Sequence, residues 1–523
     1  MSIAPVPTPG RTRRFVDAVK VGYVSQAVLM VAGLLLTPLI LSRIGQHDYG
    51  LWLVGLQITT YLLVLDLGVV ALLPRDVAYA SHRPPSDARA DGNELTALVG
   101  RAATIVLTQL PVVAVLAGVV WLLLPREWHE LRIPLGLILI TFVACFPTRI
   151  FQAVLTGLQD QAFVGWAQLA GWVTGTAVST LLVLDGRGLV SLAAGWTLTQ
   201  VIPASACWWR LRVHHPGVLP HRLSTTTWRE SREYLGNSVH MSVAQIAQTL
   251  VLGTDVLIIG KILGPAAVVP YALTGKLINL LSNQPQLFVH VALPGMAQLR
   301  ASDEGGADRL SEVASALQLA LLIFSGFVVC LVLLVNGAFL RWWVGREQFG
   351  GLTLTVLLTL VMACRHWNLS AVVTRFALGD ERRISYVTLA DGLVSVAAGV
   401  LLVRLIGPLG APIGALAGVC LVSLPKNLTA VSRETHVPLA RLLSPLIGWM
   451  KRLVPLSVAL ASLSLVWPPA TLVGITAASI VAIAACAAAA WPIVRRSSLA
   501  PHVEPWLAAL RSPLVTRAAP TGD

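Results

Sequence analysis

The residues of this chain best suited to chemistry are charged side chains inside long apolar segments. Three cations lie deep in such segments: Arg149, Lys276 and Arg365. A charge at the centre of a membrane helix costs about 2.5–3.5 kcal/mol to insert, so it usually has a function or a buried partner. Each cation therefore either contacts an anionic ligand such as a diphosphate or pairs with an acidic residue in the helix bundle. We expect at least one of the three to face a cavity.

Three aspartates, Asp66, Asp255 and Asp391, are the corresponding anions within the apolar segments. Their functional interpretation is a proton or Na⁺ site that couples transport to an ion gradient. Their structural interpretation is a hydrogen bond to backbone at a helix bend. For Asp66 and Asp255 the nearby Gly68 and Gly253 favour such a bend.

The most polar patch inside an apolar segment is SNQPQ, residues 282–286. Pro285 removes a backbone hydrogen bond, and a broken membrane helix is tolerated only against protein or water. We predict a bend here that turns Asn283 and Gln284 towards a substrate cavity. A kink that serves packing alone is the alternative.

Catalytic and metal-binding signatures are missing from the sequence. The six cysteines are isolated, the histidines show no ligand spacing, and no phosphate-binding glycine loop is present. We therefore expect no enzyme activity, no catalytic residues, no metal and no cofactor.

The polar residues lie on segments with the length and composition of membrane helices. Hydrophobic residues make up 55% of the 523 residues and charged residues 12%, with a mean hydropathy of +0.74. About 20 apolar residues cross a bilayer core. We predict an all-α integral membrane protein with 14 spans, at 16–41, 51–73, 99–124, 134–157, 164–184, 188–209, 235–263, 268–299, 313–335, 352–374, 384–406, 411–430, 453–467 and 470–494.

Lysine and arginine residues set the orientation of these spans. With the N-terminus inside, 27 of the 38 lie on the cytoplasmic side and eight on the opposite side. We therefore predict that both termini are cytoplasmic. The net charge of +13 is a topology signal, and no basic soluble face suggests a nucleic-acid partner.

The expected organisation has two six-helix lobes and a C-terminal helix pair. No segment outside the spans exceeds about 30 residues, which excludes an appended catalytic domain. Apolar residues at helical spacing predict an amphipathic helix on the cytoplasmic membrane surface within 431–452. The divisions are a tail at 1–15, an N-lobe at 16–209, a basic linker at 210–234, a C-lobe at 235–430, the amphipathic segment at 431–452, helices 13 and 14 at 453–494, and a tail at 495–523.

A weak internal repeat supports the two lobes. Gly45 and Gly264 each follow an apolar run, and an aromatic residue, Trp52 or Tyr271, appears seven positions later. Six spans return the chain to the same side, so the halves are parallel repeats. Transporters built in this way bind substrate between their halves.

Four segments carry a family resemblance. They are TPLILSRIGQHDYGLW (37–52), YLLVLDLG (61–68), GTDVLIIGKILG (253–264) and YALTGKL (271–277). The chain resembles the bacterial polysaccharide flippases of the Wzx type, in the superfamily that also holds MATE drug exporters and the lipid II flippase MurJ. It departs from the family pattern at Val269, where glycine is usual.

The resemblance implies a 12-helix core in two lobes, here with two extra C-terminal spans. It implies transport of undecaprenyl-diphosphate-linked oligosaccharide across the inner membrane, with membrane lipids and polysaccharide polymerase machinery as partners. Three alternatives remain. A MATE-like exporter would favour an acidic cavity, a lipid II flippase would share the fold, and a glycan polymerase or ligase would carry a large outer loop.

Overall fold

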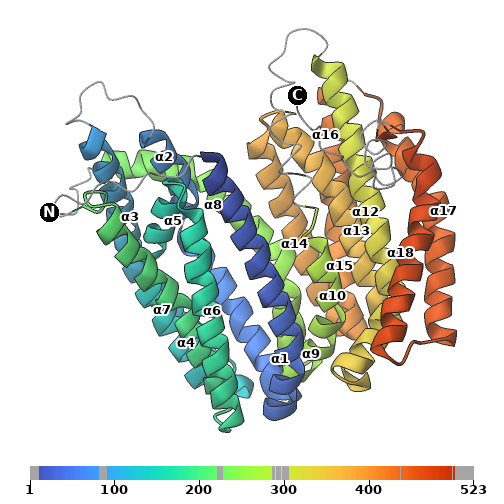
Figure 1. The fold of residues 1–523 in the computed structure, drawn as a ribbon, viewed down its shortest axis with the longest axis horizontal. Coiled ribbons are helices and arrows are strands. Elements are labelled where there is room, and N and C mark those ends of the chain that lie inside the picture. The colour runs from blue at the N-terminus through green and yellow to red at the C-terminus, as the bar shows by residue number, and fades with distance from the viewer. Residues whose placement is uncertain are drawn as a thin grey trace, which may run out of the picture. The chain divides into compact units, whose positions relative to one another are not determined.

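The computed structural model describes residues 11–66, 68–81, 91–220, 228–285, 289, 296, 306–435, 437–497 and 499–500 (Figure 1). These residues form α-helices joined by short turns, 3-10 segments and one π-helical turn, with no strand among them. The chain divides into two compact units, 1–269 and 270–523. The linker between the lobes was expected at 210–234, and this division remains a prediction. In the structure, α8, which follows the expected linker, packs against α1 within the first unit.

The all-α membrane architecture is confirmed. Eleven described helices are long and apolar enough to cross a bilayer, and two of them, Lys20–Leu65 and Glu381–Glu434, run for 46 and 54 residues. Each of these two covers two expected spans, because about 20 residues suffice for one crossing. The expected eighth span, 268–299, is interrupted, and much of its second half lies outside the described residues. The chain is a multi-pass membrane protein.

The first unit is built from helices that run side by side (Figure 1). They are α1 (Arg11–Leu62), the 3-10 segment η1 (Leu63–Asp66), α2 (Val69–Ala80), α3 (Asp91–Leu122), the 3-10 segment η2 (Arg126–Leu131), α4 (Arg132–Cys145), α5 (Arg149–Gly157), α6 (Gln161–Leu184), α7 (Leu189–His214) and α8 (Trp228–Ile262), with the start of α9 (Pro265–Thr274).

Glycines with positive φ mark the turns that the repeat predicted. Gly45 kinks α1 with φ 84° and ψ 165°, and Gly264 has φ 91° between α8 and α9. A residue without Cβ adopts such angles at little cost. Both glycines of the predicted repeat therefore occupy turns of the expected kind.

Two spans expected to be continuous are broken in the first unit. The span 51–73 is interrupted by η1 and by Gly68, which has φ 73° at the start of α2. The span 134–157 is interrupted by the turn at 146–148, where Pro147 has no N–H to donate. These breaks give α2 and α5 starting points inside the unit, and the two helices pack against each other.

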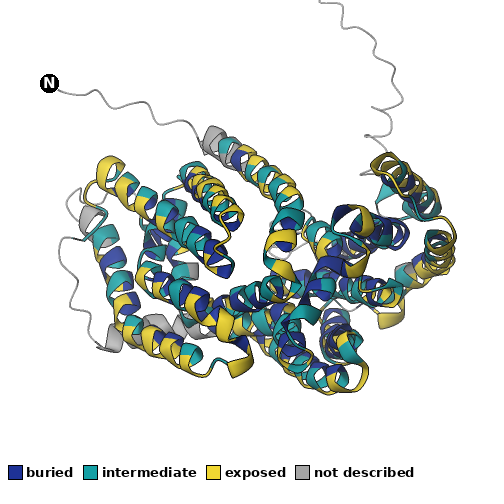
Figure 2. Cartoon of the chain, turned by 90° about the horizontal axis from the view of Figure 1, so that it is seen from below, coloured by how far each residue is buried: buried dark blue, intermediate teal, exposed yellow. Residues whose placement is uncertain are grey.

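The second unit contains the end of α9 and the later helices. They are α10 (Lys276–Ser282), α12 (Gly306–Trp343), the 3-10 segment η3 (Arg346–Gln348), α13 (Leu352–Ala377), α14 (Glu381–Ile406), the 3-10 segment η4 (Gly407–Leu409), α15 (Gly410–Gly418), the π-helical turn η5 (Val419–Ser423), α16 (Leu424–Glu434), α17 (Leu439–Val466) and α18 (Leu472–Val494). Helix α12 is the core of this unit, since 72% of its most apolar window is buried. Figure 2 shows that most other helices carry an exposed face.

Two further backbone matches relate the units to each other. Gln159 and Gly379, each two residues before a long helix, have φ 62° and 78°. Gly188 precedes α7 with φ 58° and ψ −140°, and Gly407 follows α14 with φ 70° and ψ −151°. The helix pairs α6–α7 and α14–α15 therefore begin and turn in the same way, which extends the repeat beyond the first hairpin.

The structure differs from the expected separate surface helix at 431–452. Residues 439–452 are the first half of α17, which continues without a break into the thirteenth span. The apolar side of this half packs on α12: the buried Trp449 donates its Nε1–H to the Leu322 carbonyl at 3.0 Å, and Gln318 donates to the Leu442 carbonyl at 2.9 Å. Protein covers Leu442 and Trp449, whereas Leu439, Ile447 and Met450 stay exposed.

Candidate functional site

A polar cavity of about 480 Å³ lies inside the first unit, between α1, α2, α5 and α6. One cation, Arg149, contributes to its wall. Amide and hydroxyl groups supply the other polar lining, from Ser25, Gln26, Gln152, Thr156, Gln161 and Gln168. None of the described residues that line this cavity is acidic. The cavity therefore offers one positive charge and many uncharged hydrogen-bonding groups.

Arg149 also lines a second cavity of about 400 Å³. This cavity lies between the second half of α1, η1 and α8, and its other polar residues are Thr60, Gln245, Gln248 and Thr249. The side chain of Arg149 thus lines two polar cavities of the same unit. The expectation that at least one deep cation faces a cavity agrees with this geometry.

The local sequence explains how Arg149 reaches this place. It is the first residue of α5 and follows the turn containing Pro147. Arg149, Gln152 and Thr156 lie at i, i+3 and i+7, which places them on one face of the helix. The opposite face is apolar and buried through Ile150, Val154 and Leu155. Burial of that face turns the polar face towards the cavity.

Helix α5 is seated closely on α2. A Cβ at Gly157 would lie 2.6 Å from the Val77 Cβ and 2.7 Å from the Pro74 carbonyl oxygen. Only glycine permits this approach, so the end of α5 cannot move outward without losing the contact. The packing fixes Arg149 at the other end of the same short helix.

Two of the aspartate candidates lie near the break in the first unit. The Tyr61 hydroxyl is 2.5 Å from Thr254 Oγ1, and Thr254 in turn donates to the Leu250 carbonyl. Asp255 follows Thr254 and interacts electrostatically with Tyr61. Asp66 ends η1, two residues before Gly68, and its side chain lies outside the described residues. The structure thus joins α1 to α8 beside Asp255.

In the second unit, the structure brings Arg365 and Asp391 together. The guanidinium donates to both carboxylate oxygens, at 2.5 Å from Nη1 and 3.1 Å from Nη2. The Asp391 side chain is 0% exposed and also accepts from Ser395 at 3.1 Å and Ser423 at 2.5 Å. Ser423 is the last residue of the π-helical turn. This geometry is that of a pair within the bundle, the second of the two alternatives for Arg365.

The remaining candidates belong to α10 and its end. Lys276 is the first residue of α10, is exposed, and forms no ion pair with a described residue. The helix ends at Ser282, and Asn283 and Gln284 lie in the turn before Pro285. Asn283 is exposed, whereas the Gln284 amide lies 3.5 Å from the Leu280 carbonyl. The predicted bend is present at this point.

Sequence reasoning missed the glutamines of the first unit. Gln245 and Gln248 are one turn apart on α8, and Gln152 stands one turn after Arg149 on α5. The signal was available, because amides repeated at helical spacing within apolar spans are costly unless they face a cavity or a partner.

A second buried cluster was also missed. Arg375, 2% exposed, donates from Nε to Asp380 at 3.1 Å and from Nη1 to the Asn427 amide oxygen at 2.5 Å. Asp160 of the first unit accepts from Arg210 at 2.8 Å in a related way, since Asp160 and Asp380 both stand immediately before a long helix. These pairs fix helix ends and contact neither cavity.

A further hollow in the first unit has a different character. It measures about 1150 Å³, lies between α3 and α4, and is lined almost wholly by small or apolar residues, such as Gly118, Gly136 and the exposed Ile140. Such a surface suits hydrocarbon, so it is not a candidate site for a polar ligand.

A family model described as "Polysaccharide biosynthesis protein" matches residues 18–300. The match includes α5 and α8, the helices whose Arg149 and Gln248 line the two polar cavities. The chain belongs to this polysaccharide biosynthesis family. The resemblance stated from the sequence is thereby confirmed. A search of curated proteins finds no significant match.

Solved structures with the same fold are flippases and transporters. The lipid II flippase MurJ in an inward closed conformation is 10% identical, with a TM-score of 0.64 over 92% of this chain and 99% of that one. A MATE family multidrug transporter in an outward-facing conformation is 13% identical, with a TM-score of 0.54 over 81% and 97%.

A third structure with this fold comes from Pyrococcus furiosus. This transporter of the MOP superfamily, whose pocket polarity is described as reversed, is 14% identical, with a TM-score of 0.50 over 80% and 95%. At such low sequence identities, the similarity to these three structures shows the fold of this chain and does not show its substrate.

Proposed function

We propose that this protein is a flippase that moves undecaprenyl-diphosphate-linked oligosaccharide across the inner membrane by alternating access between two lobes. The observation that carries the proposal is the pair of cavities around Arg149, rich in amides and hydroxyls. Membership of a polysaccharide biosynthesis family supports a glycan substrate. The fold shared with a lipid II flippase supports a lipid-linked one.

The cavity chemistry fits such a substrate. A guanidinium binds phosphate oxygens with two parallel hydrogen bonds, and it keeps its charge inside a membrane protein. Glutamine amides and threonine hydroxyls both donate and accept, as sugar hydroxyls require. Arg149, Gln152 and Thr156 present these groups in sequence along one helix face. Polymerase machinery that uses the translocated units is a partner under this proposal.

The polarity of the cavity argues against an exporter of cationic drugs. Such a ligand needs a carboxylate to replace its lost hydration, and the described lining of either cavity contains none. A positive wall instead disfavours a cation. The geometry therefore supports an anionic, hydroxyl-rich ligand.

Transport in liposomes tests the proposal. Purified protein should move a labelled lipid-linked oligosaccharide between leaflets without added nucleotide. Arg149→Ala should slow this movement by about 10- to 100-fold, since a hydrogen bond to a charged group contributes about 1.5–3 kcal/mol. Arg149→Lys should recover part of the rate, because charge is kept while the two-bond geometry is lost.

Arg101→Ala is the matched control, because Arg101 lies exposed on α3 and lines neither cavity. Its transport rate should equal that of the unmodified protein. Full transport by a correctly folded Arg149→Ala variant would contradict the proposed site. Faster movement of a cationic drug than of the oligosaccharide would contradict the proposed function.

A further inference from the structure

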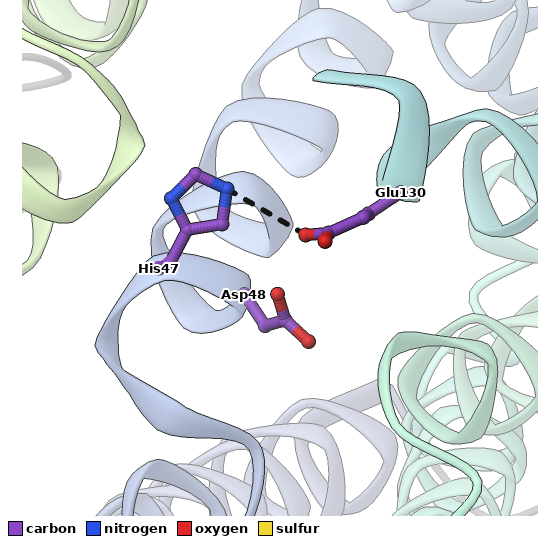
Figure 3. A group of neighbouring side chains, drawn as sticks. All are labelled: His47, Asp48 and Glu130. Atoms are coloured by element: carbon purple, nitrogen blue, oxygen red, sulfur yellow. Dashed lines mark ion pairs between the residues drawn. The ribbon is translucent and has the colours of Figure 1, made fainter. Parts of the chain in front are cut away.

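Three metal-ligating side chains meet at the kinked end of α1. His47 and Asp48 follow the Gly45 kink, and Glu130 comes from η2, far along the chain (Figure 3). One ligand atom from each side chain lies within 4.8 Å of the other two. The His47 Nε2 is 3.6 Å from the Glu130 Oε2. The three side chains point towards a common space in Figure 3.

The backbones that carry these side chains are held by contacts of their own. Gln46, beside His47, donates its amide to the Ala266 carbonyl at 2.9 Å. On the other side, Trp128 and Leu131 of η2 are buried, and Leu131 packs beside Gly55 of α1. The group is therefore built between two fixed elements rather than on a free loop. Preorganised ligands lose little conformational entropy on binding an ion.

The fold holds two carboxyl groups together without a strong cation between them. The two carboxyl groups are close neighbours, because the ligand atoms of His47, Asp48 and Glu130 all lie within 4.8 Å of one another. No lysine or arginine of the described residues forms an ion pair with Asp48 or Glu130. Lys261 lies instead 4.0 Å from Glu127, which belongs to the same 3-10 segment but not to the group. Among the described residues, His47 is the only basic side chain within ion-pair distance of either of these two carboxyl groups, and a divalent cation would offset the charge of both.

We propose that His47, Asp48 and Glu130 bind a divalent transition-metal ion, with Zn²⁺ as the preferred occupant. One imidazole nitrogen and two carboxylates supply three ligands, and water completes the coordination. An imidazole ligand favours Zn²⁺ over Ca²⁺ and Mg²⁺, which prefer oxygen alone. The bound ion would tie the kink of α1 to η2. This site is separate from the Arg149 cavities and does not depend on the proposed transport function.

No spacing pattern in the sequence indicates this group, so no metal was expected. Neighbouring side chains at 47 and 48 do not resemble a ligand motif, and the third ligand comes from another element. Only the packing of η2 on α1 brings Glu130 to them.

Titration of the full-length, tag-free protein with ZnCl₂ after treatment with a chelator tests the proposal. Calorimetry should show one Zn²⁺ per chain, with weaker Mn²⁺ binding and much weaker Ca²⁺ and Mg²⁺ binding. Zn²⁺ should also raise the melting temperature, because a ligand that binds only the folded state stabilises it. His47→Ala and Glu130→Gln should each weaken Zn²⁺ binding by about 100-fold or more, since even loss of an outer partner of a ligand costs about 10- to 100-fold.

His129→Ala and Glu127→Gln are the matched controls, because both residues are exposed in η2 and neither belongs to the group. Their Zn²⁺ affinity should be unchanged. Glu130→Gln keeps the shape of the side chain, so a loss of binding with an unchanged metal-free melting temperature supports the site. Absence of Zn²⁺ binding, or equal binding by the His47→Ala/Glu130→Gln double variant, overturns the proposal.

Discussion

In the Arg365–Asp391 pair, each charge is compensated by the opposite charge of its partner. Both oxygens of the Asp391 carboxylate accept from Arg365, and two serine hydroxyls donate to the same group. The Asp391 side chain is fully buried, and the Arg365 side chain is 18% exposed. Its attraction is offset by the cost of desolvating both ions, so the pair contributes less to net stability than its contacts suggest. Removal of one partner is far more costly than removal of both.

Arg365→Ala should therefore destabilise the second unit by about 3–5 kcal/mol, because Asp391 would remain buried without its cation. The Arg365→Ala/Asp391→Ala double variant should recover a large part of this loss. Melting temperature and the amount of folded protein in the membrane measure both effects. Arg404→Ala on the exposed side of α14 is the control and should melt like the unmodified protein. Equal instability of the single and double variants would exclude a simple pair.

Small residues let helices of the same unit approach closely. A Cβ at Gly195 of α7 would overlap the Gly175 carbonyl and the Ser179 hydroxyl of α6. In the second unit, a Cβ at Gly414 of α15 would overlap the backbone of Gly399 in α14. Membrane helices associate through such close packing, since the lipid offers no hydrophobic drive between them. In both helix pairs, α6–α7 and α14–α15, a glycine allows the two backbones to approach closely.

Gly195→Ala should lower the melting temperature, since an added methyl group in a closely packed contact costs about 1–3 kcal/mol. Gly118→Ala is the matched control, because no heavy atom lies within 4 Å of the added Cβ and the residue is also inside a helix. That variant should be as stable as the original or more stable by up to about 1 kcal/mol. Thermal unfolding of detergent-solubilised protein compares the two; equal melting temperatures would show that α6 and α7 do not pack as described.

At the scale of the whole molecule, the distribution of cations predicts how the chain crosses the membrane. The split of 27 to eight among lysine and arginine residues assigns both termini to the cytoplasm. Two long helices, Lys20–Leu65 and Glu381–Glu434, each have enough residues for two crossings, which agrees with the two pairs of spans expected there. The side on which each turn lies remains a prediction.

Cysteine labelling tests this topology in a variant from which the six free cysteines have been removed. A membrane-impermeant maleimide should label Asp185→Cys and Arg346→Cys in intact cells. It should reach Arg212→Cys and Arg433→Cys only after the membrane is opened, and reporters fused to either terminus should report a cytoplasmic position. Labelling of Arg433→Cys in intact cells would mean that the spans before it have been miscounted.

Composition, the length of the apolar segments and the positions of the glycines were enough to predict the class of the protein, most of its spans and the turns at Gly45 and Gly264. The length of an apolar segment and the conformational freedom of a glycine are local properties, so they can be predicted from the sequence. The break around Pro285 could also be predicted, because the missing N–H of a proline is a local property of the sequence. The sequence favoured a bend near Gly68, but the 3-10 segment at 63–66 and the turn at 146–148 were not expected, because the point at which a helix ends and the direction of the next one depend on packing.

The contacts of the polar residues, by contrast, became known from the packing of the helices. It placed Arg149 at two cavities, paired Arg365 with Asp391, and brought Glu130 to His47 and Asp48. These outcomes depend on which helix faces meet and on the rotation of each helix by fractions of a turn. Sequence shows that a charge inside a membrane segment needs a partner, whereas the packing of distant helices selects which partner it receives.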